Sequence, residues 1–493
     1  MRPLLDYSIT IETLVRLLSA SSELDPSLTF TGITSSDKNV EPGDLFLAYP
    51  GKNSHGAQFA RTAIANGALA ILTDSEGAKI AKGLPIIVVE NIRSAGALVS
   101  AHLYKNPMKE MVSIGITGTN GKTTVSTLLY QLFQASGRES GLIGTVETRI
   151  GTDVIASTRT TPEADYLQAL SAAMSERHLR HLVMEVSSHA LVAKRMHGAH
   201  FAIAGFTNLS QDHLDFHPDM ELYFLAKASL FSLEYADLAL INIDDNYGRR
   251  LFENSKIPAV SVARDNPKAT WHFVSRTSTA HGFDFTIRGA GGILIESATA
   301  LRGNFNLDNL LLVVAIATEC GLDPLDIAAL LPGLTGAPGR MESVEAGQNF
   351  KAIVDYAHTP DAVANVLSAA REFTTGKLIS VLGCGGDRDN TKRPIMGSAL
   401  AAGSDIAIFT SDNPRNENPD HILTQMTSGI TVSQPSRVIS DRREAIAYAL
   451  SQATEGDTVL ILGKGHELGQ EILGEKFDFD DRRVLKEEMG NLG

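Results

Sequence analysis

The run VSIGITGTNGKTTVSTLLYQLF (112–133) decides the fold of the middle of the chain. Its first six residues predict a buried strand, and Val125, Leu128 and Leu129 begin an apolar pattern at helical spacing that continues to Phe133. A strand, a glycine-containing loop and a helix in this order form a phosphate-binding site at the helix N-terminus. The run therefore predicts a nucleotide-binding domain built on a parallel sheet.

The loop between this strand and helix contains the residues expected to bind a nucleotide, and by itself such a loop is typical of a switch, a motor, a kinase or a ligase. The amine of Lys122 is placed to reach the β- and γ-phosphates, and Thr123 offers its hydroxyl to Mg²⁺. The spacing departs from the common G-x-x-x-x-G-K-[ST] loop because position 116 is isoleucine, so the matching form is GTNGKT. A purely structural Gly-Lys turn is the alternative. The loop residues expected at ATP are Gly118, Thr119, Asn120, Gly121, Lys122, Thr123 and Thr124.

Working outward from this loop, the chain divides into three blocks. The break at Asn106-Pro107 and the Gly/Pro-rich segment 333–340 give domains 1–108, 109–337 and 338–493. We expect a small α/β domain, a central phosphate-loop domain with a parallel sheet, and a C-terminal Rossmann-like, doubly wound domain, because strands and helices alternate in the last block.

Composition restricts the possible functions. The 493 residues have a net charge of -14, which argues against nucleic-acid binding and against binding to an anionic membrane. Cys320 and Cys384 lie outside any metal-ligand spacing and predict two reduced thiols. The N-terminus lacks the apolar stretch of a signal peptide, and the longest apolar run is too short to span a bilayer. We therefore expect a cytoplasmic protein without membrane insertion.

Polar side chains follow the predicted strands of both larger domains. Ligands of open α/β sheets bind beyond the carboxyl ends of the strands, so these side chains predict a cleft shared by two domains. They are Lys122, Glu185, Asn208, His358, Asp412 and Lys464.

Three features of the middle block have both a functional and a structural interpretation. Glu185 ends a buried strand, either as a Mg²⁺ ligand or as a cap of the next helix. The segment QDHLDFH (211–217) is either a ligand cluster or a solvated helix start. Lys227 is the single lysine of an apolar stretch, which a surface lysine with a buried stem would also explain.

Eleven motifs in order resemble the Mur ligase family over nearly the whole chain. They are GTNGKTT, TTPEA, MEVSSHAL, FTNLSQDHLDFH, YFLAKASLF, GNFNLDN, GAPGRME, VDYAHTPD, CGGDRDNTKRP, DNPR and GKGHE.

The resemblance implies an ATP-dependent ligase of cell-wall precursor synthesis that acts as a monomer. It implies three substrates, ATP, UDP-N-acetylmuramoyl-L-alanyl-D-glutamate and meso-diaminopimelate, with Mg²⁺ as the cofactor. The D-glutamate carboxylate attacks the γ-phosphate of ATP, and the amine of the incoming amino acid then displaces phosphate from the acyl phosphate. Positioning and charge neutralisation are expected to dominate such a reaction.

The resemblance also assigns site residues. Catalysis is assigned to Lys122, Glu185, His213 and Lys227, and metal binding to Thr123, Glu185, His213 and carbamylated Lys227. Further ATP contacts are Asn306, Asn309, Arg340, Asp355 and His358, with helix capping as the alternative for Asn309. The UDP-muramoyl dipeptide is assigned to Ser36, Asp37, Ser54, His55, Gly56, Thr160, Thr161, Ser187 and Arg195. At residues 36–38 the chain reads Ser-Asp-Lys where many relatives read Asp-Ser-Arg.

The segment SDNPRNENP (411–419) predicts the amino acid. It places Arg415 in a tight turn, where a guanidinium can pair with the distal carboxylate that distinguishes meso-diaminopimelate from L-lysine. A simple surface turn is the alternative. By resemblance, the amino-acid site comprises Arg393, Asp412, Asn413, Pro414, Arg415, Gly463 and Glu467.

Three other functions share part of this sequence pattern. A lysine-adding ligase would catalyse the same step without needing Arg415. A folylpolyglutamate synthase would share the phosphate loop and the central domain but lack the first block and the DNPR segment. A non-catalytic nucleotide switch would have no use for the second-metal residues His213 and Lys227.

Overall fold

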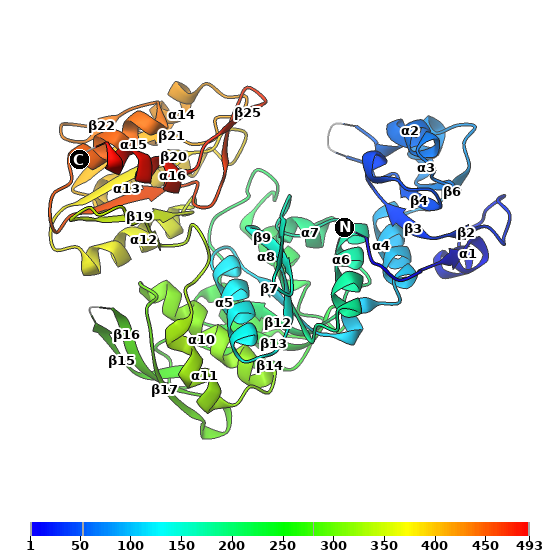
Figure 1. Ribbon diagram of the computed structural model, residues 1–493, viewed down its shortest axis with the longest axis horizontal. Coiled ribbons are helices and arrows are strands. Elements are labelled where there is room, and N and C mark those ends of the chain that lie inside the picture. Colours follow the sequence, from blue (N-terminus) through cyan, green and yellow to red (C-terminus); the bar gives the residue numbers. More distant parts are fainter. Residues whose placement is uncertain (1, 52–53, 280, 492–493) are drawn as a thin grey trace.

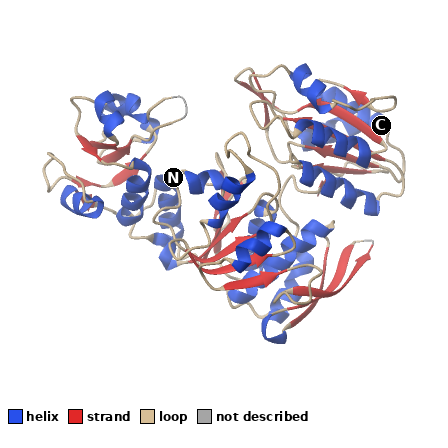
Figure 2. Ribbon diagram, turned by 180° about the vertical axis from the view of Figure 1, so that it is seen from behind, coloured by secondary structure: helices blue, strands red, loops and turns tan. Residues whose placement is uncertain are grey.

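The computed structural model describes residues 2–51, 54–279 and 281–491, and it has three lobes arranged in chain order (Figure 1). Each lobe is built on its own mainly parallel sheet with helices packed against it (Figure 2). Among the described residues, no helix has the length and apolarity needed to cross a membrane.

The first lobe is a small four-stranded parallel sheet in the order β3-β4-β5-β6. Apolar clusters lie on both of its faces. The strands of this lobe are β1 (Ile9–Thr10), β2 (Thr29–Phe30), β3 (Gly32–Thr34), β4 (Asp44–Leu47), β5 (Ala70–Thr73) and β6 (Ile86–Val88). The helices are α1 (Ile11–Leu18), α2 (Ala60–Ala65), α3 (Ser75–Ile80) and α4 (Ile92–Leu103).

The central lobe contains an eight-stranded sheet in the order β10-β9-β8-β11-β7-β12-β13-β14. Six strands run parallel, and β9 and β10 extend one edge as an antiparallel hairpin. The strands are β7 (Val112–Thr117), β8 (Ser140–Ile143), β9 (Glu147–Ile150), β10 (Asp153–Ala156), β11 (His181–Glu185), β12 (Phe201–Phe206), β13 (Ala236–Asn242) and β14 (Ala259–Val262).

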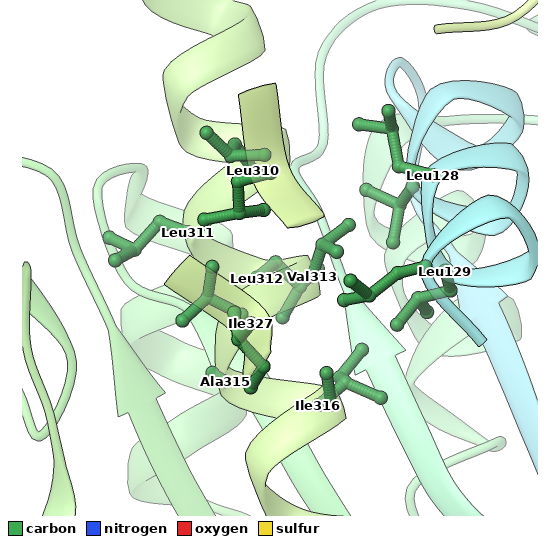
Figure 3. Packing of buried hydrophobic residues seen from close by; sticks show 14 of the residues in the cluster. Leu128, Leu129, Leu310, Leu311, Leu312, Val313, Ala315, Ile316 and Ile327 are labelled. Atoms are coloured by element: carbon green, nitrogen blue, oxygen red, sulfur yellow. The ribbon is translucent and has the colours of Figure 1, made fainter. Parts of the chain in front are cut away.

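Helices cover both faces of the central sheet. One face packs against α5, α10 and α11, where Leu128 and Leu129 meet Val313, Ile316 and Ile327 in a fully buried core (Figure 3). The other face packs mainly against α6, α8 and α9. The helices are α5 (Lys122–Ala135), α6 (Ala164–Glu176), α7 (Ser188–Val192), α8 (Met220–Ala228), α9 (Asn246–Glu253), α10 (Asn304–Glu319) and α11 (Pro324–Leu330).

A three-stranded antiparallel sheet, absent from the sequence prediction, completes the central lobe. It consists of β15 (His272–Thr279), β16 (Gly282–Arg288) and β17 (Leu294–Thr299). Phe285 and Ile287 face the core shared with α10, while alternate residues are exposed. This alternation is the signature of an antiparallel sheet with one wet face.

The third lobe is a six-stranded sheet with helices on both faces, which confirms the predicted doubly wound domain. Only the short edge strand β18 is antiparallel to its neighbour. The strands are β18 (Glu342–Ser343), β19 (Lys351–Asp355), β20 (Leu378–Cys384), β21 (Ile406–Ser411), β22 (Arg437–Val438) and β23 (Thr458–Leu462), followed by the hairpin β24 (Gly469–Ile472) and β25 (Glu475–Asp478). The helices are α12 (Pro360–Phe373), α13 (Arg393–Gly403), α14 (Pro419–Met426), α15 (Arg442–Ser451) and α16 (Asp481–Gly490).

Candidate active site

The phosphate loop has the backbone geometry expected of a phosphate-binding turn. Gly118 and Gly121 have φ angles of 149° and 87°, and α5 begins directly afterwards at Lys122. A Cβ atom at Gly121 would lie 2.3 Å from the Asn309 Oδ1 atom, so only glycine allows this close approach. The loop is also fixed from β12, because the Asn120 backbone N–H donates to the Asn208 Oδ1 atom at 3.0 Å.

Lys122 is half-buried and lies back across its own loop. Its Nζ atom donates to the carbonyl oxygens of Gly118 and Thr119, both at 2.8 Å. Burial lowers the pKa of this amine, although Glu185 and Asp212 act in the opposite direction. Lys122 is therefore held beside the turn that is predicted to bind phosphate.

Thr123 and Glu185, the two predicted ligands of one Mg²⁺, lie in contact. The Thr123 hydroxyl donates to the Glu185 Oε2 atom at 3.0 Å, and Thr145 donates to both carboxylate oxygens. Glu185 is fully buried. The helix-capping interpretation of Glu185 is wrong, because the side chain of Ser187 caps α7.

Lys227 is buried, with 1% of its surface exposed, so its interpretation as a surface lysine is wrong. Its Nζ atom donates to the Gly118 carbonyl oxygen at 2.7 Å and lies 4.8 Å from the centre of the Tyr223 ring. Burial, followed by repulsion from Lys122, lowers the pKa of Lys227 well below its usual value. The buried amine of Lys227 therefore favours the unprotonated form more than an exposed lysine does, and it lies next to the phosphate loop.

The Asp/His cluster is mostly buried, and it is not a solvated helix start. Helix α8 begins at Met220 and is capped by Asp219, whereas Asp212 and His217 are 4% and 3% exposed. The His213 Nε2 atom lies 3.4 Å from the Asp212 Oδ2 atom, and burial lowers the pKa of His213 to about 3. His213 is therefore a neutral imidazole, the form that binds metals.

A cavity of about 300 Å³ extends from the phosphate loop to the third lobe. Asn309, Arg340 and Asp355 line it, and Arg340 reaches within 3.5 Å of the Thr123 hydroxyl. Asn309 lies inside α10 rather than at its start, so the capping interpretation is wrong. Asn306 supports this wall by accepting a hydrogen bond from Asn309 at 3.4 Å.

A second cavity, of about 520 Å³, lies between the central and third lobes. It brings together predicted residues from both lobes and places them beside Asp212. They are Thr160, Thr161, Ser187, Arg195, His213, His358, Asp412, Asn413, Arg415, Gly463 and Glu467. His358 was assigned to ATP but lines this cavity instead of the first, and burial lowers its pKa to about 4.

Contacts between the central and third lobes close this second cavity. The Lys392 Nζ atom lies 3.2 Å from the Asp212 Oδ1 atom, and the Gln211 amide donates to the Thr391 hydroxyl at 3.1 Å. Asp212 is therefore shared between His213 on its own lobe and Lys392 on the other. Burial raises the pKa of Asp212, but Lys392 and, in acid where it becomes protonated, His213 lower it by more, so the carboxyl stays ionised.

The third-lobe wall of this cavity differs from the prediction at one arginine. Arg393 does not line the cavity; it is fully buried, and its guanidinium holds both oxygens of Glu417 at 2.8 Å. Arg388, which the sequence analysis missed, lines the cavity together with Arg415. Arg388 lies five residues before Arg393 in the same motif. Residue spacing alone does not show which of these two arginines lines the cavity.

Arg415 is held in its predicted turn. Its φ angle is 52°, and its Nη1 atom donates to the Gly386 carbonyl oxygen at 2.6 Å. Its backbone is tied on both sides to the β24 hairpin through Glu471 and Leu473. Arg415 is therefore not a loose surface arginine. Pro414 belongs to the same turn but does not line the cavity.

A third cavity, of about 700 Å³, lies between the first and central lobes. Ser36 lines it, with Lys38 beside it, but Asp37, Ser54, His55 and Gly56 do not. His55 is occupied with Asp74, 3.1 Å away, and with the backbone N–H of Ala57. Arg159, a residue that the sequence analysis did not identify, lines both this cavity and the second one.

The side chains of Thr123 and Glu185 can supply only part of the ligand shell of Mg²⁺, and substrate phosphates would have to supply further ligands. In residues 2–51, 54–279 and 281–491, no group of three or more His, Cys, Asp or Glu side chains is arranged to hold a metal ion. Thr123 and Glu185 nevertheless present hard oxygen atoms 3.0 Å apart beside the phosphate loop. Mg²⁺ usually takes one or two protein carboxylates and completes its shell with phosphate and water, so this pair suits it.

The fold and the site define the class: a three-domain ligase with a phosphate loop in its central domain. Three family models match in order, described as "Mur ligase family, catalytic domain" (27–107), "Mur ligase middle domain" (116–317) and "Mur ligase, glutamate ligase domain" (339–465). The chain belongs to the Mur ligase family.

Individual relatives agree with this assignment. A UDP-N-acetylmuramoyl-L-alanyl-D-glutamate--2,6-diaminopimelate ligase from Streptomyces coelicolor is 47% identical over 472 residues, which is 94% of this chain and 93% of the relative. A solved structure with the same name has a TM-score of 0.68 at 31% identity and covers 98% of this chain and 99% of its own. A Mycobacterium tuberculosis folylpolyglutamate synthase complexed with ADP and AMPPCP shares the fold over 75% of this chain and 92% of its own, with a TM-score of 0.62 at 19% identity.

Proposed function

We propose that this protein adds meso-diaminopimelate to UDP-N-acetylmuramoyl-L-alanyl-D-glutamate at the expense of ATP, in the cytoplasmic synthesis of peptidoglycan precursor. The observation that supports it most is the cavity between the central and third lobes. Its walls combine the phosphate-loop side, through His213, with two arginines and a carboxylate on the other side. Such a site suits a substrate amino acid that has charged groups at both ends.

The phosphate loop and the buried lysines serve the first step, in which the D-glutamate side-chain carboxylate attacks the γ-phosphate. The loop amides and Lys122 hold the triphosphate, and Arg340 lies beside Thr123 to offset charge on the transferred group. Thr123 and Glu185 would hold Mg²⁺, which when bound neutralises charge on the β- and γ-phosphates. The γ-phosphoryl group is transferred to the substrate carboxylate, and ADP is released.

Lys227 and His213 would hold the acceptor carboxylate through a second cation. The unprotonated amine would react with CO₂ to form an N–C bond and release one proton, and the resulting carbamate would supply an anionic oxygen ligand where an ammonium would repel the cation. The lowered pKa of Lys227 supports this modification because only the unprotonated amine is nucleophilic. Without a bound cation, placing the acceptor carboxylate beside the anionic phosphates in a buried site would be costly.

In the second step the amine of the amino acid attacks the acyl phosphate and expels phosphate. Arg415 and Arg388 suit the distal carboxylate of meso-diaminopimelate, and Glu467 suits the neighbouring ammonium. L-lysine has no such carboxylate, which disfavours the lysine-adding alternative. The cavity between the first two lobes, with Ser36, suits the UDP portion, which a folylpolyglutamate synthase does not bind.

The test is an ADP-release assay with purified protein, ATP, Mg²⁺ and the UDP-dipeptide, supplied in turn with meso-diaminopimelate, L-lysine or no amino acid. We expect sustained release and a tripeptide product, identified by mass spectrometry, only with meso-diaminopimelate. Product formation with L-lysine at equal efficiency would overturn the amino-acid assignment. ADP release that ignores both the dipeptide and the amino acid would favour a nucleotide switch.

A further inference from the structure

Lys464 is a fully buried cation next to the amino-acid cavity, and it does not line that cavity. It follows β23, and its Nζ atom has three acceptors: the Asn413 Oδ1 atom at 3.1 Å, the Glu467 Oε2 atom at 3.0 Å and the Gly469 carbonyl oxygen at 2.7 Å. An ammonium has three N–H donors, so all of them are used within the protein. Lys464 therefore has no proton left for a bound ligand.

The acceptors of Lys464 join two segments that are separate in sequence. Asn413 follows β21, while Glu467 follows β23, and their side chains meet in a 2.7 Å hydrogen bond from Asn413 Nδ2 to Glu467 Oε2. The Asn413 Oδ1 atom also accepts from the Glu471 backbone N–H at 3.0 Å. The amide orientation of Asn413 is thus set by two donors to its oxygen and one acceptor for its nitrogen.

This network leaves one carboxylate oxygen of Glu467 for a ligand. Among the described residues, both hydrogen bonds to the Glu467 side chain go to Oε2. Glu467 lines the cavity and is partly exposed, so the Oε1 atom remains available to an amino acid that binds there. A carboxylate fixed in this way can bind an ammonium group at a defined position in the cavity that Arg388 and Arg415 also line.

We propose that Lys464 is the positioning residue that sets recognition of the substrate ammonium, because it holds Glu467 and Asn413 in one orientation. The inference rests on the proposed function, since it takes an amino acid as the ligand of this cavity. Removing the ammonium leaves Glu467 without its buried counter-ion and frees the Asn413 amide to turn. Binding sites depend on such supporting contacts, because a charged group loses affinity when it is free to move.

The experiment uses the full chain with Lys464→Met, which keeps the length of the side chain but removes its charge and donors. We expect the KM for meso-diaminopimelate to rise about 10- to 100-fold, the effect of losing a hydrogen bond to a charged group. The KM values for ATP and for the UDP-dipeptide should stay within about twofold. Lys476→Met, on the exposed hairpin strand β25, is the matched control and should change none of the three.

A double-mutant cycle with Glu467→Gln separates positioning from a general structural role. If Lys464 acts through Glu467, Lys464→Met should raise the KM for meso-diaminopimelate only slightly in a protein that already carries Glu467→Gln. Additive losses, or equal increases in all three KM values, would overturn the proposal. Should Lys464→Met not fold, Lys464→Gln is measured in the same way, and an unchanged KM for meso-diaminopimelate would also overturn it. Failure of the proposed function is distinct, because the unmodified protein would then form no product with meso-diaminopimelate.

Discussion

Lys227 and Lys122 share one acceptor, the carbonyl oxygen of Gly118. Their Nζ atoms lie 2.7 Å and 2.8 Å from it, although the two lysines come from different helices. Positive charge on both amines at one oxygen would be repulsive, and Lys122 accordingly contributes, after burial, to the lowered pKa of Lys227. Binding of an anionic phosphate, or conversion of one amine to a carbamate, would relieve this repulsion. Replacing either lysine by alanine should therefore impair ligation, but for a different reason in each case.

Lys122→Ala should abolish ligation while leaving the fold intact. Within residues 2–51, 54–279 and 281–491 the amine donates hydrogen bonds only to its own loop, so its loss removes charge stabilisation of the transferred phosphoryl group rather than core packing. We expect a rate decrease of about 10³-fold or more, measured as ADP release, with an unchanged melting temperature. The exposed Lys256→Ala variant is the control. Half of the normal activity in Lys122→Ala would contradict the phosphate-loop assignment.

Lys227→Ala should be nearly inactive because it removes the site of the carbamate. Acetate or formate at high concentration should restore part of the activity by occupying the vacated ligand position. The modification itself is checked by ¹³C NMR after supply of ¹³CO₂, which should give a carbamate signal in the normal protein and none in Lys227→Ala. Full activity under CO₂ depletion, together with no signal, would exclude the modification.

Arg415→Ala and Arg388→Ala should each erode the preference for meso-diaminopimelate over L-lysine. In the normal protein the ratio of the kcat/KM values could approach about 10⁴, because lysine offers no carboxylate to the two guanidinium groups that line the cavity. Each variant should lower kcat/KM for meso-diaminopimelate and leave the value for L-lysine nearly unchanged. Arg393→Lys is expected to act differently, by lowering the melting temperature, because Arg393 is bound to Glu417 inside the domain. A ratio unaffected by either of the first two substitutions would refute the arginine assignment.

Lys392→Ala should loosen the contact between the central and third lobes. Lys392, which directly precedes α13 in the third lobe, forms a buried ion pair with Asp212 of the central lobe. Its loss leaves the buried carboxylate without this counter-ion. Small-angle X-ray scattering should show a larger radius of gyration for this variant. Adding an ATP analogue and the UDP-dipeptide should compact the normal protein more than the variant. Identical profiles for both proteins would argue against closure through this pair.

His181 should make the central domain sensitive to acid. Burial, followed by repulsion from Arg138 and Arg180, lowers its folded-state pKa to about 4, whereas the unfolded value is about 6.5. Between these values only the unfolded chain binds the proton, so the free energy of unfolding falls as the pH falls from about 6.5 to about 4. His181→Gln should reduce this slope by up to about 1.4 kcal/mol per pH unit.

The measurement for His181 is urea unfolding followed by tryptophan fluorescence. The single tryptophan, Trp271, is buried in the same core as Phe133, on which the His181 ring stacks at 4.3 Å. Unfolding of the central domain is therefore reported directly. An equal pH slope in the normal protein and in His181→Gln would show that His181 titrates normally in the folded state.

Sequence alone predicted the features that depend on neighbouring residues. The phosphate loop is one, because its glycines, Lys122 and Thr123 act within a single turn between β7 and α5. The turn at Arg415 is another, since an Asn-Pro pair restricts the backbone locally. The alternation of strands and helices also predicted the doubly wound third domain, because periodicity reports which faces are buried.

Tertiary structure alone decided which side chains face a cavity. Arg388 and Arg393 lie in one motif, and only the position of Glu417 on a later loop shows that Arg393 is already paired. Burial of Lys227 likewise follows from the packing of α8 against the phosphate loop. The antiparallel sheet formed by β15, β16 and β17 packs its apolar side chains against α10, which comes later in the chain. Contacts between segments distant in sequence leave no spacing pattern, so they become visible only when the chain has folded.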